Sequence, residues 1–305
     1  LHEKLAKLKV LDPACGCGNF LIIAYRELRL LELEVLKILY PKKDSMLDFG
    51  TKYFSKIDVD QFYGIEIEEF PAKVAELALW LTDHQMNVLF SEEFGHYYAR
   101  LPLIKSPTII NDNALRIDWE AIAEKNNINY ILGNPPFIGK KEQKFEQKKD
   151  MKLIFDSMKG FGVLDYVTCW YIKAAKYMQN TKIKTAFVST NSITQGEQVG
   201  ILWNELFNKY SIKIHFAHRT FKWSNEAKNN ATVHVVIIGF AAFDSNSKYL
   251  FDYHDIKGDA HVLNVKNINP YLSESEDLVV QKRSNPICNV PIMNYGSMPI
   301  DSGFL

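Results

Sequence analysis

The sequence has few cysteines, no metal-ligand pattern and no long apolar segment, and each absence excludes a class of protein. Its four cysteines are too scattered for a disulfide framework. Cys15 and Cys17 form a C-x-C pair without a second pair, and the eight histidines show no ligand spacing, which argues against a zinc site. No signal peptide is recognisable, and no apolar run is long enough to span a bilayer. We therefore expect a cytoplasmic protein with no metal and no membrane contact.

Net charge is also absent, because 36 basic and 36 acidic side chains cancel. A polyanion would therefore have to be bound by a local patch rather than by the field of the whole protein. The 305 residues, 47% of them hydrophobic, suffice for one elaborated α/β domain with an appendage. Hydrophobic periodicity fades near residue 245, and a tail with prolines and glycines follows. We expect a main domain at 1–245 and an extension or connector at 246–305.

Four short apolar runs predict buried parallel strands, and a polar residue stands at the end of each. The runs are residues 9–11, 62–67, 108–110 and 130–132, and the polar residues at their ends are Asp12, Glu66, Asp112 and Asn134. The carboxyl ends of parallel strands lie along one edge of a sheet, which is where open α/β sheets bind ligands. The sequence therefore predicts a row of polar groups along a ligand-binding edge.

The segment Asp12–Phe20, DPACGCGNF, connects the first strand to a helix through a glycine turn. This arrangement brings backbone amides close to a ligand. Gly16 and Gly18 match two positions of the dinucleotide fingerprint G-x-G-x-x-G, but Leu21 occupies the third, which disfavours a nicotinamide dehydrogenase. Because Asp12 can accept hydrogen bonds from an ammonium group, the loop suits a zwitterion better than a pyrophosphate.

Two other strand ends indicate what else the ligand edge could hold. Glu66 is placed to accept hydrogen bonds from both hydroxyls of a ribose, although a solvated acid at a strand end is the alternative. In GNPPF, the side-chain oxygen of Asn134 and the carbonyl of Pro135 could both accept from one amino group. Phe137 adds an apolar face for a planar ring. The alternative is an ordinary loop, because Asn-Pro often begins a turn.

Two segments further along the chain mix positive charge with aromatic rings. Residues 140–152, which include Lys140 and Lys141, hold six lysines against three acids and predict a mobile helix or loop. They could bind phosphates beside the site or form a solvated face. A long loop at 219–228 carries Phe221 and Trp223, which could stack on a base or cap the core.

Three later strands complete the expected fold. They are predicted at 184–189, 212–218 and 232–240, and the last two alternate like a hairpin with a long loop. We expect an α/β fold with a mainly parallel seven-stranded sheet, helices on both faces and the antiparallel hairpin at one edge.

Four motifs in order, DPACGCGNF, YGIEI, NDNAL and GNPPF, resemble those of the amino-methylating DNA methyltransferases of the gamma group. The longer segments LGNPPFIG, TNSI and FKWSNEAKNNATVHVVIIGF are similar to the methylase core of MmeI-like restriction-modification enzymes. The resemblance covers residues 9–300. It implies a Rossmann-like fold and the cofactor S-adenosylmethionine, with residues 1–245 as the methyltransferase catalytic domain.

The resemblance also implies a role for each motif. The cofactor would be held by Asp12, Pro13, Ala14, Gly16, Gly18, Glu66, Ile67 and Asp112. Among these, Glu66 would hold the ribose and Asp112 the adenine amino group. An adenine flipped out of double-stranded DNA would be taken by Asn134, Pro135, Pro136 and Phe137. DNA would be contacted by Lys140, Lys141, Phe221 and Trp223. Adenine is preferred over the cytosine amino group on the resemblance alone, and the absence of a Pro-Cys nucleophile argues against carbon-5 methylation.

The chain departs from that family in what flanks the core. The segment expected before the first strand is nearly absent, as is a nuclease domain, and the target-recognition domain is missing or only begun. The chain therefore looks like a fragment of a longer protein with those domains as partners. Ribosomal-RNA amino methylases and release-factor glutamine methylases share an Asn-Pro-Pro-aromatic tip and remain alternatives, as does a catalytically silent specificity module. The size, the basic segment and the long loop favour DNA.

Overall fold

The centre of the molecule is a single twisted sheet. The computed structural model describes residues 1–39, 55–94, 105–156, 158–223, 233–253, 258–281 and 288–290. Within these residues, nine strands pair in the order β3-β2-β1-β4-β5-β7-β6-β8-β9. They are β1 (Val10–Asp12), β2 (Phe62–Glu66), β3 (Thr108–Asn111), β4 (Tyr130–Gly133), β5 (Lys184–Thr190), β6 (Lys213–Trp223), β7 (Val233–Ala241), β8 (Lys248–Asp252) and β9 (His261–Val265).

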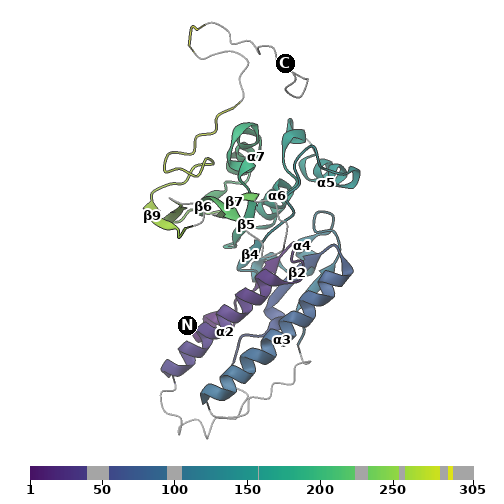
Figure 1. The fold of residues 1–305 in the computed structure, drawn as a ribbon, viewed down its shortest axis with the longest axis vertical. Coiled ribbons are helices and arrows are strands. Elements are labelled where there is room, and N and C mark those ends of the chain that lie inside the picture. The colour runs from purple at the N-terminus through teal and green to yellow at the C-terminus, as the bar shows by residue number, and fades with distance from the viewer. Residues whose placement is uncertain are drawn as a thin grey trace, which may run out of the picture.

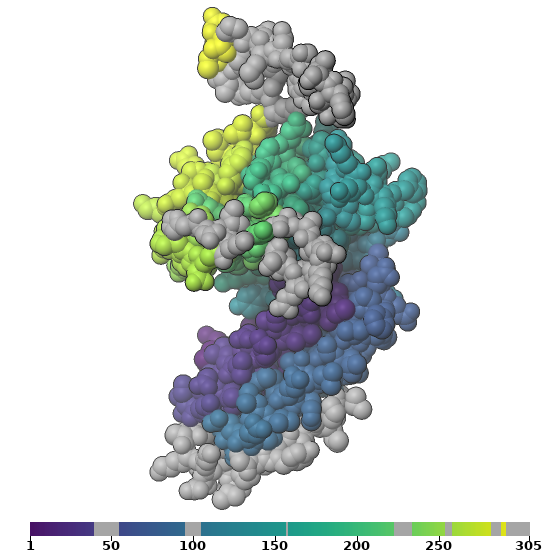
Figure 2. Space-filling model, in the orientation of Figure 1, coloured from purple at the N-terminus to yellow at the C-terminus, as the bar shows by residue number. Residues whose placement is uncertain are grey.

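Helices connect the strands and cover the sheet (Figure 1). The α-helices are α1 (His2–Leu5), α2 (Asn19–Leu39), α3 (Glu69–Phe94), α4 (Trp119–Ile122), α5 (Phe145–Phe155), α6 (Thr168–Tyr177) and α7 (Gly196–Asn208). Short 3-10 helices are η3 (Val59–Gln61), η4 (Lys125–Asn127), η5 (Phe161–Val163) and η6 (Asn191–Thr194). Figure 2 shows the surface of α2 and α3 at one end of the molecule and that of the later helices towards the other.

The first five strands are parallel, so their carboxyl ends share one edge. Val10 of β1 pairs with Phe62 of β2 on one side and with Tyr130 of β4 on the other. Strand order therefore reverses beside β1, with β2 and β3 to one side and β4 and β5 to the other. In open α/β sheets the crevice outside the carboxyl ends at such a reversal is the usual ligand site. Asp12 ends β1 and Asn134 follows β4, and these two strands flank this point.

Two hydrophobic clusters cover the two faces of the sheet. Successive residues of a strand point to opposite faces, and Val10 and Leu11 accordingly belong to different clusters. Val10 packs with apolar residues of α2 and α3. Leu11 packs with the cluster that contains the buried faces of α6 and α7. This arrangement confirms the predicted α/β fold with helices on both faces.

The structure differs from the prediction at the far end of the sheet. β6 and β7 pair antiparallel as expected, but they do not form the edge, because β8 pairs with β6 and β9 pairs with β8. These two strands have five residues each and were missed because short, partly exposed strands give little periodic signal. Both strands belong to the same sheet although they lie beyond residue 245. The predicted domain boundary at that residue therefore remains a prediction.

The start of the predicted loop at 219–228 is also strand. β6 continues through Trp223, where Phe221 pairs with Val235 and Trp223 pairs with Val233. A register shift between His218 and Phe221 interrupts the alternation that would have indicated a longer strand. Residues 224–228 lie outside the described residues.

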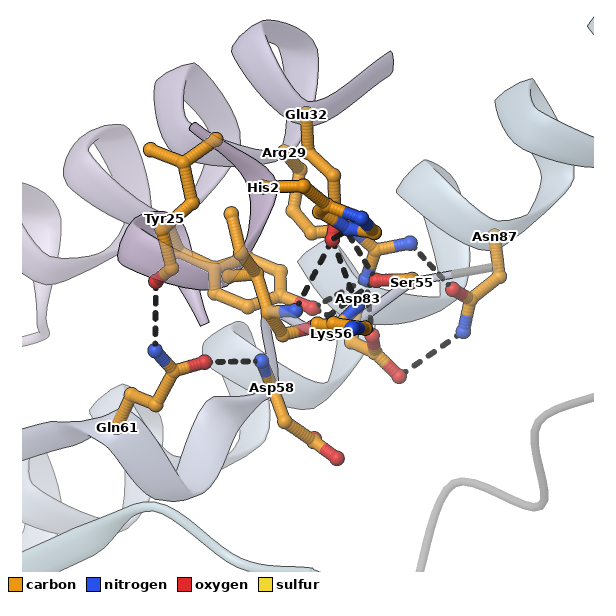
Figure 3. A network of polar contacts seen from close by, with 12 residues as sticks. His2, Tyr25, Arg29, Glu32, Ser55, Lys56, Asp58, Gln61, Asp83 and Asn87 are labelled. Atoms are coloured by element: carbon orange, nitrogen blue, oxygen red, sulfur yellow. Dashed lines mark hydrogen bonds and ion pairs between the residues drawn. The ribbon is translucent and has the colours of Figure 1, made fainter. Parts of the chain in front are cut away.

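A buried polar network holds α2 against α3 (Figure 3). Arg29 is fully buried, and its guanidinium donates to Tyr25 at 2.5 Å, to Asp83 at 2.9 Å and to Asn87 at 2.8 Å. Burial lowers the pKa of Arg29, but its acidic neighbours more than offset this, so its pKa is raised and it stays charged. Glu32 extends the network to the segment at 55–57 by accepting hydrogen bonds from that segment.

Candidate functional site

A cleft of ≈ 1000 Å³ lies at the carboxyl ends of the first four strands. Its lining includes the following residues that the sequence predicted: Pro13, Ala14, Gly16, Glu66, Ile67, Asp112, Asn134 and Pro136. The other wall comes from α5 and from the start of α6, which the sequence did not indicate. The structure therefore brings Glu66, Asp112 and Asn134 to one cavity together with the loop after β1, whereas Asp12 itself is not among the lining residues.

Asp12 lies beneath this cleft at the end of β1, with none of its surface exposed. Its Oδ1 accepts a hydrogen bond from the backbone N–H of Ala14 at 3.0 Å. Its Oδ2 is buried and has no hydrogen-bond partner among the described residues. Burial raises the pKa of Asp12 to about 7, the Ala14 N–H lowers it, and the negative charge of Glu66 adds to the rise. Such a buried acceptor suits a cationic group.

Glu66 supports the glycine loop from the neighbouring strand. Its Oε2 accepts from the N–H of Gly16 at 2.9 Å, and its Oε1 accepts from the N–H of Glu68 at 3.0 Å. Each carboxylate oxygen has capacity for a further hydrogen bond, and the residue is only partly buried. Glu66 can therefore accept from the hydroxyls of a ligand while it fixes the loop.

The two loop glycines have different tasks. Gly16 has φ +54° and lines the cleft, with open space where a Cβ would stand. Gly18 has φ +86°, and a Cβ there would lie 3.0 Å from the Cβ of Ala75 on α3. Gly18 is not among the lining residues. It therefore permits the close approach of α3 to the loop.

The GNPPF segment follows β4 at the side of the cleft. The Oδ1 of Asn134 is buried and has no hydrogen-bond partner among the described residues, although the residue itself is only partly buried. Pro135 is buried and Pro136 exposed. A Cβ on Gly133 would lie 2.7 Å from the Oδ1 of Asp12, so the two loops touch. Asn134 thus offers a free acceptor close to Asp12.

Phe137 differs from the expectation of an exposed stacking face. Its ring is half-buried and packs against the large hydrophobic cluster, and it is not among the residues that line the cleft. The physical reason lies one residue further along, where the carbonyl of Ile138 accepts a hydrogen bond from the N–H of Tyr166 at 2.9 Å. This bond holds the end of the segment against the core.

Of the predicted DNA contacts, Lys140, Lys141 and Phe221 are not among the residues that line the cleft. Lys140 and Lys141 are exposed on the turn before α5, and neither lines the cavity, although Lys144 does. The ring of Phe221 stacks on that of Tyr253 at 5.2 Å. The side chain of Trp223 lies outside the described residues. Neither Phe221 nor Tyr253 is among the residues that line the cleft.

Sequence reasoning missed the wall formed by α5 and α6. Asp150 is buried and lines the cleft, although its position in a lysine-rich segment indicated a solvated charge. The indole N–H of Trp170 donates to the carbonyl of Pro13 at 3.0 Å, which connects α6 to the glycine loop. From the sequence, the aromatic residues of this helix are expected in the core. No local pattern distinguishes a core aromatic from one that also borders a cleft.

Metal and membrane features are both missing from the described part of the chain. No three histidine, cysteine or acidic side chains gather closely enough there to hold a metal ion. None of the helices described combines the length and the apolar character needed to cross a bilayer.

Comparisons with known proteins agree with the geometry. The family model described as "MmeI, DNA-methyltransferase domain" matches residues 1–252. The chain is 46% identical to DNA methyltransferase A of Bacillus subtilis over 309 aligned residues, which cover 100% of the chain and 34% of that protein.

Solved structures extend the comparison. The type IIL restriction-modification enzyme MmeI, in complex with DNA, is 54% identical with a TM-score of 0.93, over 99% of this chain and 40% of that one. The type IIG restriction endonuclease BpuSI has a TM-score of 0.52 at 13% identity, over 81% of this chain and 24% of that one, and shares the fold alone. The chain thus spans 34% of the length of the Bacillus subtilis methyltransferase and 40% of the length of MmeI.

Proposed function

This chain belongs to the family of MmeI DNA-methyltransferase domains, and on that premise we propose that it methylates the exocyclic amino group of adenine in DNA with S-adenosylmethionine. The reaction would serve a restriction-modification system. One observation carries the proposal: two buried oxygens have no hydrogen-bond partner among the described residues, Oδ1 of Asn134, which lines the cleft, and Oδ2 of Asp12, which ends the paired strand β1 directly before the lining residues Pro13 and Ala14. An acceptor left unsatisfied in a buried position is costly, and binding a donor there relieves the cost.

The residues present fit a cofactor that is both cationic and a nucleoside. Asp12 offers its unpartnered oxygen for an ammonium group, beside the backbone of Ala14 and Gly16. Glu66 accepts from ribose hydroxyls, and Ile67, which is 61% exposed on the cleft wall, provides an apolar surface for the adenine ring. Asp112, exposed at the end of β3, accepts from the adenine amino group. When bound, the cofactor supplies an electrophilic methyl group.

The chain's own contribution to the reaction is positional. The Oδ1 of Asn134 and the carbonyl of Pro135 accept from the amino group of the target base and hold its nitrogen in line for the transfer. The target nucleotide must leave the duplex, which costs a few kcal/mol. Pro136 would border the pocket that receives it, and Phe137, which packs against the hydrophobic cluster, would support that border from behind. Contacts to the DNA would come from Lys140, Lys141, Phe221 and Trp223.

The rest of the protein would select the site. Because the chain spans only part of its relatives, we propose that a target-recognition segment and a nuclease segment outside it choose and cleave the DNA. The methylase core would then act on whichever adenine that segment presents. A bound duplex would lie across the carboxyl edge of the sheet, where the cleft opens.

The test is Asn134→Ala in the full polypeptide, with labelled S-adenosylmethionine and genomic DNA read out base by base. We expect methyl transfer to adenine to fall by at least about a hundredfold while cofactor affinity stays within about twofold. Asn129→Ala is the matched control, because Asn129 stands at the opposite end of the same strand and its Oδ1 accepts from the N–H of Lys9 at 2.9 Å. Its transfer rate should be unchanged.

Three results would contradict the proposal. Transfer by Asn134→Ala at the rate of the unmodified protein would remove the proposed role of the amide. Transfer to RNA or to a release-factor glutamine instead of DNA would place the chain among the alternative acceptors. Failure of the unmodified polypeptide to bind S-adenosylmethionine in calorimetry would indicate a silent specificity module.

A further inference from the structure

We propose that Asp150 is a positioning residue that makes the cofactor pocket selective for adenine, by holding in place the loop that carries Asp112. The inference rests on the proposed function, in which Asp112 accepts from the adenine amino group. Asp150 lies on α5, and only 2% of its surface is exposed. It does not need to touch the adenine, because it acts through the loop.

The carboxylate of Asp150 joins three separate segments of the chain. Its Oδ1 accepts from Nε of Arg116 at 2.7 Å. Its Oδ2 accepts from Nδ2 of Asn113 at 3.1 Å and from the hydroxyl of Tyr166 at 2.7 Å. Burial and the negative charge of Asp150 raise the pKa of Tyr166, so its hydroxyl stays protonated and donates. One buried side chain therefore connects α5, the loop after β3 and the segment before α6.

Asp112 stands between two anchors of that loop. On the side of β2, the N–H of Asp112 donates to the carbonyl of Glu66 at 3.0 Å, and Nδ2 of Asn111 donates to the same carbonyl at 3.0 Å. On the side of α5, Asn113 and Arg116 are both held by Asp150. Loss of the second anchor would leave Asp112 fixed on one side only.

Asn113 connects Asp150 to the backbone turn that follows Asp112. Its Oδ1 accepts from the N–H of Leu115 at 2.9 Å, which forms the turn after Asp112. Its Nδ2 donates to Asp150, so one amide side chain couples the turn to α5. A carboxylate is needed at 150, because all three neighbours donate and an asparagine would place a donor where Oδ2 now accepts.

The chain provides a matched control in Asp83. This residue is 3% exposed, and its carboxylate likewise accepts from an arginine, a tyrosine and an asparagine, namely Arg29, Tyr25 and Asn87. The group joins α2 to α3 and lies outside the lining of the cleft. A substitution there disturbs an equivalent network without reaching Asp112.

The experiment compares two ligands that differ at the adenine amino group and, as a consequence, in whether the neighbouring N1 carries a hydrogen. The full polypeptide and its Asp150→Asn and Asp83→Asn variants are titrated in calorimetry with S-adenosylhomocysteine and with S-inosylhomocysteine, which has an oxygen in place of that amino group. We expect the unmodified protein to prefer the first ligand by about tenfold or more, because a site built for a donor rejects a ligand that lacks it. Asp150→Asn should reduce the preference to about threefold or less by weakening the first ligand. Asp83→Asn should keep the full preference.

Further variants separate positioning from general damage. In Asp112→Ala the preference should already be lost, and adding Asp150→Asn should change it no further, which is the signature of two residues that act in one chain of contacts. Asn113→Ala breaks the same connection from the other side and should behave like Asp150→Asn. It also serves if Asp150→Asn fails to fold.

The possible results are distinct. If the unmodified protein binds neither ligand, the proposed function fails first. If it binds both equally, the proposed contact of Asp112 with the adenine amino group fails together with the role of Asp150, while methyl transfer to DNA is not affected by this result. If Asp150→Asn and Asn113→Ala keep the tenfold preference, only the role of Asp150 is overturned. If both variants weaken the two ligands by the same factor, Asp150 is only structural, and the inference is likewise wrong.

Discussion

Asp83 and Asp150 occupy two regions that use the same polar chemistry for different ends. Each is a buried aspartate that accepts hydrogen bonds from an arginine, a tyrosine and an asparagine. Around Asp83 the arginine is fully buried, and these three partners lie on α2 and α3. Around Asp150 the side chain of Arg116 is 45% exposed, and the partners come from segments that border the cleft. The two networks have the same composition, so their roles must differ because of the segments to which the partner residues belong.

The largest expected contrast is in stability. Asp83→Ala removes the carboxylate that hydrogen-bonds the buried Arg29 and leaves it with the more distant Glu32, at 3.6 Å, and we expect a loss of about 3–5 kcal/mol in the free energy of unfolding. Asp150→Ala should cost less, about 1–3 kcal/mol, because water can reach Arg116 when the carboxylate is gone. Urea denaturation of both variants at one pH measures the difference. Equal losses would mean that exposure of the arginine does not separate the two networks.

Asp12 is also a buried aspartate, but among the described residues no cationic side chain pairs with it. The pKa of Asp12 is about 7 in the folded protein and about 4 in an unfolded chain. Between these values the folded state binds the proton more tightly, so the free energy of unfolding falls as pH rises towards 7. Asp12→Asn cannot ionise, so relative to the unmodified protein it should gain roughly 2–3 kcal/mol more at pH 8 than at pH 5. Denaturation at the two pH values tests this. Asp83→Asn is the control and should be destabilised at both.

The same residue predicts how cofactor binding depends on pH. Only the ionised Asp12 can accept fully from an ammonium group, and below pH 7 it is mostly protonated in the free protein. We expect the association constant for S-adenosylhomocysteine to fall roughly eightfold between pH 7.5 and pH 6, because binding must then displace a proton. Calorimetry across this range measures the slope. Asp12→Asn should bind weakly with no slope, and a persisting slope would assign it to another group.

The smallest expected effect concerns the two tyrosines. Tyr25→Phe and Tyr166→Phe each remove one hydroxyl that donates to the aspartate, at 2.5 Å and 2.7 Å. Each should lower the free energy of unfolding by about 1 kcal/mol. Only Tyr166→Phe should also weaken S-adenosylhomocysteine, by about twofold, because only it supports the loop that carries Asp112. Thermal denaturation and calorimetry on both variants separate these effects.

The ligand edge could be predicted because its signals are local. Asp12 and Glu66 end short apolar strands, and Asp112 and Asn134 directly follow two others. Once these strands are taken as parallel neighbours, their carboxyl ends lie at one edge of the sheet. The glycine turn and the proline pair also indicate the local backbone conformation directly from the sequence. The structure confirms the mainly parallel α/β fold that these signals indicated.

The second wall of the cleft could not be predicted, because its contacts join distant residues. Asp150 lies 34 and 37 positions from Arg116 and Asn113, and nothing in the periodicity of the lysine-rich segment connects them. Phe137 was expected to offer a stacking face, but the hydrogen bond between Tyr166 and Ile138 keeps its segment against the core. The sequence does not predict β8 and β9 for a different reason, because short strands at the edge of a sheet show little apolar alternation.

The hydrogen bond between Trp170 and Pro13 spans 157 positions of the chain. Contacts of such long separation form late, since a large loop must close before they are made. During translation, the glycine turn therefore leaves the ribosome long before the helix that completes it. A nascent polypeptide that ends before α6 would lack this hydrogen bond, and its cleft would be incomplete. We therefore expect that a ligand of the cleft can stabilise the growing chain only after α6 has been synthesised.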